Sequence, residues 1–128
     1  ILDGVYESEF AICSFDSTVN DAQIQRLAYL YNYTPTVKVA AKGSSDCFSF
    51  ADFKVEKGEI LMTTMYCEEG DVLVRFCNYS DEDGVAYFKP LIGNVTEETD
   101  LLGKKIAEVK DNTLCFRPWE IKTIRIER

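Results

Sequence analysis

Short runs of alternating or wholly apolar residues, separated by turn-forming residues, constrain this chain more than any other feature of its sequence. Such runs recur roughly 8–12 residues apart, which is the spacing of strands in a β-sandwich. They cover residues 5–15, 47–55, 60–66, 72–77, 85–89, 113–116 and 121–127. Connections this short leave no room for the helices that a parallel sheet needs. The pattern therefore predicts a mainly β fold, an antiparallel β-sandwich of about seven strands with one short helix.

The helix is expected where the period of the apolar residues changes. Ile24, Leu27, Ala28 and Tyr31 follow one another at the i, i+3, i+4 and i+7 positions of one helix face. A polar run rich in N-cap residues precedes them. Pro35 lies just beyond and prevents continuation.

The strands differ in their expected place in the sheets. Residues 72–77 are apolar on both faces, which is typical of a central strand. Residues 85–89 precede Pro90, which marks the end of a strand or an edge. The polar residues 57–58, 68–71 and 80–84 are expected to form the intervening turns.

Length and charge restrict the number of domains and the kinds of partner that this chain can have. The 128 residues suit a single domain spanning 1–128, and the absence of an initial Met suggests a fragment of a larger multidomain protein. A net charge of −8 argues against a nucleic-acid partner, because phosphate binding relies on Lys and Arg. No apolar run is long enough to span a membrane.

Five cysteines, an odd number, cannot all be paired in disulfides. Each lies in an apolar stretch, where a free thiol behaves as a small buried hydrophobe. They indicate a reducing compartment, and a bacterial cytoplasm is the expected location. Asn-x-Ser/Thr sequons at Asn32, Asn78 and Asn94 are weighted less than the cysteines.

Catalytic chemistry has little support in this sequence. The chain contains no His, which excludes Ser-His-Asp and Cys-His machinery and removes the commonest zinc ligand. Carboxylates gather at residues 68–71 and 81–83, both in expected hairpin turns, where solvated charge is the ordinary interpretation. Asp81, Asp83 and Gly84 only faintly resemble a calcium loop and lack its spacing. We therefore predict no catalytic, cofactor-binding or metal-binding residue.

Aromatic residues offer one alternative. Tyr29, Tyr31 and Tyr33 lie together near the end of the expected helix, and Trp119 lies near the C-terminus. Such rings can stack on sugars, although filling the core is the commoner role of aromatic side chains.

Two stretches resemble the C-terminal β-domain of glycoside hydrolase family 38 α-mannosidases of bacterial type. Residues 117–126 (Arg-Pro-Trp-Glu-Ile-Lys-Thr-Ile-Arg-Ile) are similar to the closing segment of that family, and residues 71–78 (Asp-Val-Leu-Val-Arg-Phe-Cys-Asn) to one of its strands. Residues 99–102 resemble its Thr-Asn/Asp-Leu-Leu element, but Gly103 stands where the family often has Glu. Residues 55–67 resemble the preceding strand of the family, and residues 6–15 resemble an early strand more loosely.

The resemblance implies a non-catalytic domain of a zinc-dependent retaining α-mannosidase. Such a domain would pack against the catalytic barrel of the same chain and help to shape the glycan cleft. Zinc and the mannoside substrate would belong to the parent enzyme, so this fragment alone is expected to be no enzyme. Two other classes remain open: a free-standing carbohydrate-binding module with exposed, coplanar aromatics, and an immunoglobulin-like interaction domain with cysteines bridging two sheets.

Overall fold

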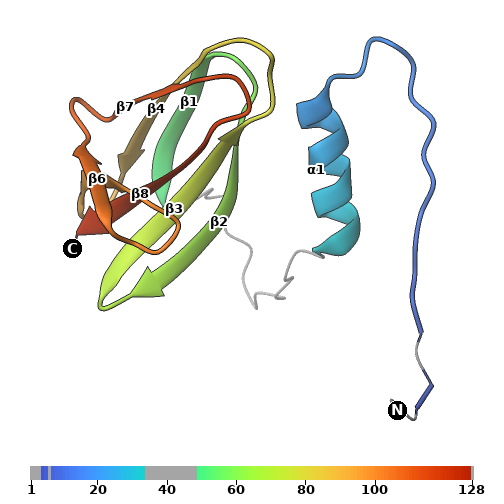
Figure 1. Ribbon diagram of the computed structural model, residues 1–128, viewed down its shortest axis with the longest axis horizontal. Helices are drawn as coiled ribbons and strands as arrows, with labels where there is room; N and C mark the ends of the chain where they lie inside the picture. Colours follow the sequence, from blue (N-terminus) through green and yellow to red (C-terminus); the bar gives the residue numbers. More distant parts are fainter. Residues whose placement is uncertain (1–3, 6, 34–48, 128) are drawn as a thin grey trace, which may run out of the picture.

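The computed structural model describes residues 4–5, 7–33 and 49–127, and they form a β-sandwich with one helix (Figure 1). The described elements are α1 (Asp21–Asn32), β1 (Ala51–Lys57), β2 (Ile60–Glu68), β3 (Asp71–Asn78), β4 (Gly84–Pro90), β5 (Asn94–Thr99), β6 (Lys105–Glu108), β7 (Thr113–Phe116) and β8 (Ile121–Glu127). The mainly β class predicted from the sequence is confirmed.

The eight strands form two antiparallel sheets. One has three strands in the order β1-β4-β7, and the other has five in the order β2-β3-β8-β5-β6. The prediction that residues 72–77 form a central strand is confirmed, because β3 pairs with β2 on one side and β8 on the other. Pro90 marks the end of β4 rather than an edge, since β4 is the middle strand of its sheet.

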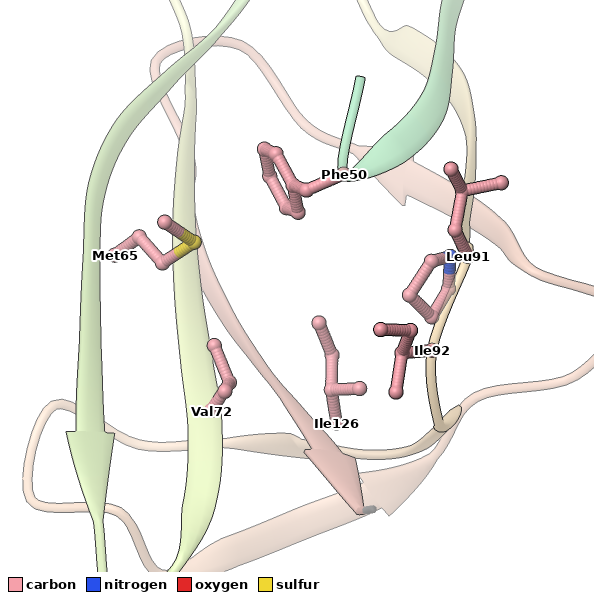
Figure 2. A pocket seen from close by; sticks show the side chains of 7 residues that line it. Phe50, Met65, Val72, Leu91, Ile92 and Ile126 are labelled. Carbon is pink, nitrogen blue, oxygen red and sulfur yellow. The ribbon is translucent and has the colours of Figure 1, made fainter. Parts of the chain in front are cut away.

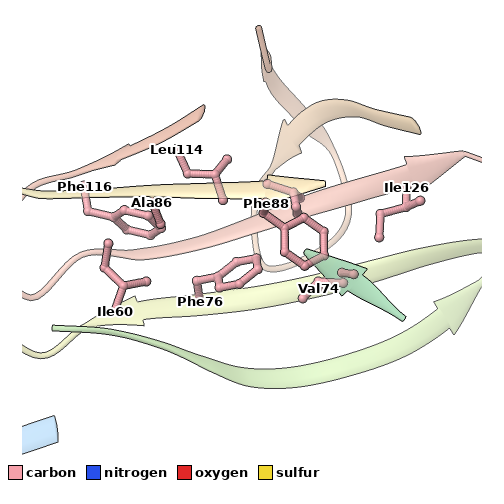
Figure 3. Close-up of a cluster of buried hydrophobic side chains, with 10 residues drawn as sticks. Ile60, Val74, Phe76, Ala86, Phe88, Leu114, Phe116 and Ile126 are labelled. Carbon is pink, nitrogen blue, oxygen red and sulfur yellow. The ribbon is translucent and has the colours of Figure 1, made fainter. Parts of the chain in front are cut away.

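The core lies between the two sheets (Figure 3). Its ten buried members come from six strands: Ala51, Ile60, Val74, Phe76, Ala86, Phe88, Leu114, Phe116, Ile124 and Ile126. Phe76 of β3 and Phe88 of β4 meet edge to face across the interface, with ring centroids 5.2 Å apart. Burying each of these two phenylalanine side chains stabilises the fold by about 1.5–3 kcal/mol. Because the two rings come from different sheets, their contact helps to hold the sheets together.

Helix α1 confirms the prediction from periodicity, and a capping box begins it. The Asn20 side chain accepts from the Gln23 backbone N–H, and the Gln23 side chain accepts from the Asn20 N–H. The apolar stripe does not face the sandwich: Ile24, Leu27 and Tyr31 line a hollow against the extended segment 9–15. Pro35 lies outside the described residues.

The prediction of a strand at residues 5–15 is wrong for the described residues of that range, because residues 7–15 adopt no regular structure. They run alongside α1, away from both sheets (Figure 1). A strand is stable only when a neighbour satisfies its backbone, and no sheet edge lies beside this segment. Phe10 and Ile12 consequently remain exposed.

Two strands, β5 and β6, were not predicted. Val-Thr-Glu-Glu-Thr in β5 is mostly polar and carries little alternation of apolar residues. It pairs with β8 nevertheless, because cations on β8 neutralise its two glutamates: Arg125 lies 3.1 Å from Glu97 and Lys122 lies 2.8 Å from Glu98. Cross-strand partners of this kind are invisible in a local sequence window.

The predicted turns are present, but two of them connect one sheet to the other. Residues 68–71 form the β2–β3 hairpin, with Glu69 and Gly70 at positive φ angles of 52° and 98°. Residues 57–58 and 80–83 instead carry the chain from one sheet to the other, so the hairpin expected at 81–83 is wrong. The strand expected at 47–55 begins at Ala51, and its first two residues lie outside the described part.

Candidate functional site

The buried side chain of Asn78 organises one end of the sandwich. It is 0% exposed at the end of β3. Its Oδ1 accepts from the Glu59 N–H at 3.2 Å, and its Nδ2 donates to the carbonyls of Glu82 at 2.7 Å and Arg117 at 3.1 Å. One amide therefore joins three loops. We call Asn78, Glu59, Glu82, Arg117 and Glu120 the polar end.

The turn Arg117–Glu120 leads into β8 at this polar end. The Glu120 carboxylate accepts from the Arg117 N–H at 2.8 Å and from its guanidinium at 3.0 Å. Burial acts to raise the pKa of Glu120, but the hydrogen bonds from Arg117 and the charges of Lys122 and Arg117 outweigh it. The pKa of Glu120 therefore lies below its ordinary value. Lys122 lies 3.9 Å from Glu120 and bonds more closely, at 2.8 Å, to Glu98 on β5.

Trp119 lies at the tip of the same turn, with a positive φ of 58°. Its indole Nε1 donates to Asp81 Oδ1 at 2.8 Å, and its ring meets the edge of Tyr79 at 86°. Burial, together with the neighbouring Cys77 and Tyr29, raises the pKa of Tyr79 to about 12. The hydroxyl of Tyr79 is therefore a neutral structural group.

A second charge cluster lies on the outer face of the five-stranded sheet around Arg125. Its guanidinium bonds to Glu97 at 3.1 Å, to Asp71 at 3.2 Å and to the Gly103 carbonyl at 2.7 Å. Burial acts to lower the pKa of Arg125, but the hydrogen bond that Arg125 donates to Asp71 and the charges of Glu97 and Asp71 outweigh it, so the pKa lies above its ordinary value. Asp71 thus belongs to an ion pair rather than to a solvated tip.

The opposite end of β3 and β8 carries an apolar cleft of about 430 Å³ between the sheets (Figure 2). Its lining comprises Phe50, Met65, Val72, Pro90, Leu91, Ile92 and Ile126, and we call this set the apolar cleft. Ile126 and Pro90 are buried at its floor, whereas Leu91 is 59% and Ile92 is 73% exposed. Among the residues that the structure describes, no charged side chain lines it.

The arrangement offers no obvious chemistry for a reaction. Within residues 4–5, 7–33 and 49–127, no group of three or more His, Cys, Asp or Glu side chains is placed to hold a metal ion. Asp81, part of the faint calcium-loop pattern, is bonded to the indole of Trp119. Among the described residues, no helix is long and apolar enough to cross a membrane.

The aromatic platform that the sequence left open as an alternative is not assembled among the described residues. The rings of Tyr29 and Tyr33 are 5.8 Å apart but tilted by 35°, and Trp119 lies perpendicular to Tyr79. Tyr31 faces the extended segment instead. The described tyrosines and Trp119 therefore present no coplanar surface.

The described cysteines form no disulfide, and the Asn78 of one sequon is buried. Cys13, Cys67, Cys77 and Cys115 are free, which disagrees with an immunoglobulin-like disulfide between the sheets for the part of the chain described. Only Cys77 of these four is buried, so the expectation of burial at each was wrong for the other three. The sequon at Asn78 is part of the core, since its amide nitrogen already makes two hydrogen bonds.

The role of Asn78 was not predicted, although it ends one of the two stretches that carried the family resemblance. The other stretch supplies Arg117 and Glu120. The structure brings both stretches into contact through the Asn78 amide and the bond from the Asn78 N–H to the Glu120 carbonyl at 3.0 Å.

Comparison with known proteins gives one result. The model of the "Glycosyl hydrolases family 38 C-terminal beta sandwich domain" matches residues 59–124, just over half of the chain. No curated protein and no solved structure shows a significant match.

Proposed function

Because this chain belongs to glycosyl hydrolase family 38 through its C-terminal β-sandwich domain, we propose that it is a non-catalytic structural domain of a larger α-mannosidase-like glycoside hydrolase. It would pack against the catalytic barrel of the same polypeptide and help to shape the glycan cleft. The observation that carries this proposal is the family match, which spans β2 to the middle of β8.

The exposed apolar surface supports a docking role. Leu91 and Ile92 at the apolar cleft project into solvent, and so do Phe10 and Ile12 beside α1. Contiguous apolar surface on a domain marks an interaction site more often than an isolated exposed side chain does. The apolar cleft is therefore the part of the sandwich best suited to contact the rest of the parent enzyme.

The zinc expected in the parent enzyme finds no site in this part of the chain. The sequence has no His, and the described carboxylates and thiols form no ligand cluster. We propose that the metal, the catalytic residues and the mannoside lie in other parts of the parent. The proposed location is the cytoplasm of a bacterium.

The size of the native polypeptide tests the proposal. Antibody raised against this chain should detect, in source-cell extract, a band several times heavier than 14.6 kDa. The immunoprecipitate should hydrolyse an aryl α-mannoside, and pre-immune serum should recover no such activity. A native band near 14.6 kDa would contradict the multidomain proposal and favour a free-standing carbohydrate-binding module.

The docking role has its own test in the full-length protein. Leu91→Ser with Ile92→Ser should lower the thermal stability of the parent enzyme, because both side chains lose apolar contacts with the catalytic part. Lys110→Ser, an exposed change outside the apolar cleft, is the matched control. In the isolated chain the double variant should bind less of an apolar fluorescent dye and unfold at an unchanged temperature. Equal stability of the parent with either variant would place the docking surface elsewhere.

A further inference from the structure

Trp119 is held unusually rigidly for a side chain at the tip of a turn. Its N–H donates to the Ser80 carbonyl at 3.3 Å, and the turn closes through the Glu120 N–H and the Arg117 carbonyl at 3.2 Å. Asn78, fully buried, anchors the same Arg117 carbonyl. The backbone of Trp119 is therefore fixed to the polar end from both sides of the turn.

The backbone of Trp119 is strained. Its φ of 58° lies in the left-handed region, which is costly for a bulky side chain. Strained conformations persist where the surroundings impose them, and they are concentrated at binding and catalytic sites. Trp119 remains 48% exposed, so part of its surface stays accessible to a ligand.

The free part of the indole has a defined chemical character. Its polar N–H is already bonded to Asp81 Oδ1 at 2.8 Å, so the part exposed to solvent is apolar ring surface. The Tyr79 ring stands perpendicular to it, with centroids 6.4 Å apart, and forms a wall beside it. The second carboxylate oxygen of Asp81, an exposed residue, makes no hydrogen bond to the described part of the chain.

We propose that Trp119 and Asp81 form a saccharide-binding site. A pyranose presents one face of C–H groups and a rim of hydroxyls. The C–H face would stack on the indole, and one hydroxyl would donate to Asp81 Oδ2, because an ionised carboxylate is an acceptor only. The choice of a mannoside as ligand rests on the proposed function, whereas the site itself rests on the geometry of Trp119.

The chain offers a direct reporter, because Trp119 is its only tryptophan. Titrating the whole chain with α-mannobiose to millimolar concentration should change the tryptophan emission in a saturable manner. Mannitol, an acyclic polyol without a ring face, is the matched control and should produce no saturable change. Asp81→Asn should weaken the response at least several-fold while the emission of the free protein still reports a folded turn.

The second variant, Trp119→Phe, is followed by NMR, since it lacks the reporter. Its mannobiose-induced shifts should disappear, while Tyr31→Phe on the far side of α1 should leave the shifts as in the wild type. No saturable change, or an equal response to mannitol, would overturn the site. An indole that becomes protected only within the full-length protein, and ignores sugar there also, would make Trp119 a contact between domains and overturn it as well.

The two proposals fail separately. A heavy native band with α-mannosidase activity and a null titration would remove the saccharide site and leave the proposed function. A band near 14.6 kDa with a saturable titration would do the reverse.

Discussion

The two ends of β3 and β8 differ in how fully their side chains are packed and hydrogen-bonded within the described chain. At the polar end, the Asn78 side chain joins three loops: its amide oxygen accepts one hydrogen bond and its amide nitrogen donates two. At the apolar cleft, the same two strands end among aliphatic side chains, and Ile92 remains 73% exposed. The first end satisfies its buried amide within the domain, whereas the second leaves apolar surface exposed among the described residues.

The physical reason is the difference between directional and non-directional interactions. A buried amide must find partners within the fold, because leaving one unsatisfied costs about 1–3 kcal/mol. Exposed apolar surface leaves no hydrogen-bonding group unsatisfied, and the free-energy cost of its contact with water is proportional to its area. A domain can therefore leave an apolar end open for a partner, but it must close a buried polar end by itself.

The largest expected effect comes from removing the Asn78 side chain. Asn78→Ala leaves the Glu59 N–H and the carbonyls of Glu82 and Arg117 without their partner, and should lower the free energy of unfolding by about 3 kcal/mol. Urea denaturation measures it. The control is Asn94→Ala on β5, an exposed asparagine that should change stability by less than about 0.5 kcal/mol. Equal losses in the two variants would break the comparison between the two ends.

A smaller effect distinguishes two glycines that share a positive φ. Gly58, with φ of 82°, lies at the polar end, where an added Cβ would come 2.9 Å from the Gly84 Cα. Gly70, with φ of 98°, has open space around it. Alanine at either position adds about 1–2 kcal/mol of backbone strain, and crowding at Gly58 should add about 1 kcal/mol more. Thermal denaturation of the two variants gives the difference, and a larger loss for Gly70→Ala would show that the polar end is less tightly packed than its hydrogen bonds imply.

The smallest effect is the dependence of stability on pH at the polar end. The folded state lowers the pKa of Glu120 from its ordinary value of 4.5, so its contribution is complete above 4.5 and is lost as the pH falls through the lowered pKa. Glu120→Gln should cost about 1 kcal/mol at neutral pH and flatten the loss of stability in acid. Urea midpoints measured from neutral pH into this acid range test it. Parallel pH profiles for the variant and the wild type would show that the Glu120 carboxylate adds nothing to the polar end.

Much of the fold was predictable because the signals are local. Strands β2, β3, β4, β7 and β8 lie where short apolar runs placed them, and the apolar stripe after a polar run rich in N-cap residues predicted α1. The failures required partners distant in sequence. The segment 7–15 has a strand-like composition but no strand beside it, while β5 has a polar composition and the cations of β8 beside it.

The candidate sites divide in the same way. That Trp119 and Asn78 lie in recognisable stretches was evident from the sequence, and the absence of His already excluded the commonest catalytic machinery. The hydrogen bond from Trp119 to Asp81, 38 residues away, was not evident from the sequence.

By itself, the sequence determined the fold class, the family and the positions of most strands, because alternation, turn residues and short motifs act over a few neighbouring residues. Only the tertiary structure decided that Asn78 would close the polar end, that Glu97 and Glu98 would lie in a strand, and that Leu91 and Ile92 would be exposed at the apolar cleft. Each of these depends on which side chains meet across a sandwich, and those contacts join residues that the chain separates by tens of positions.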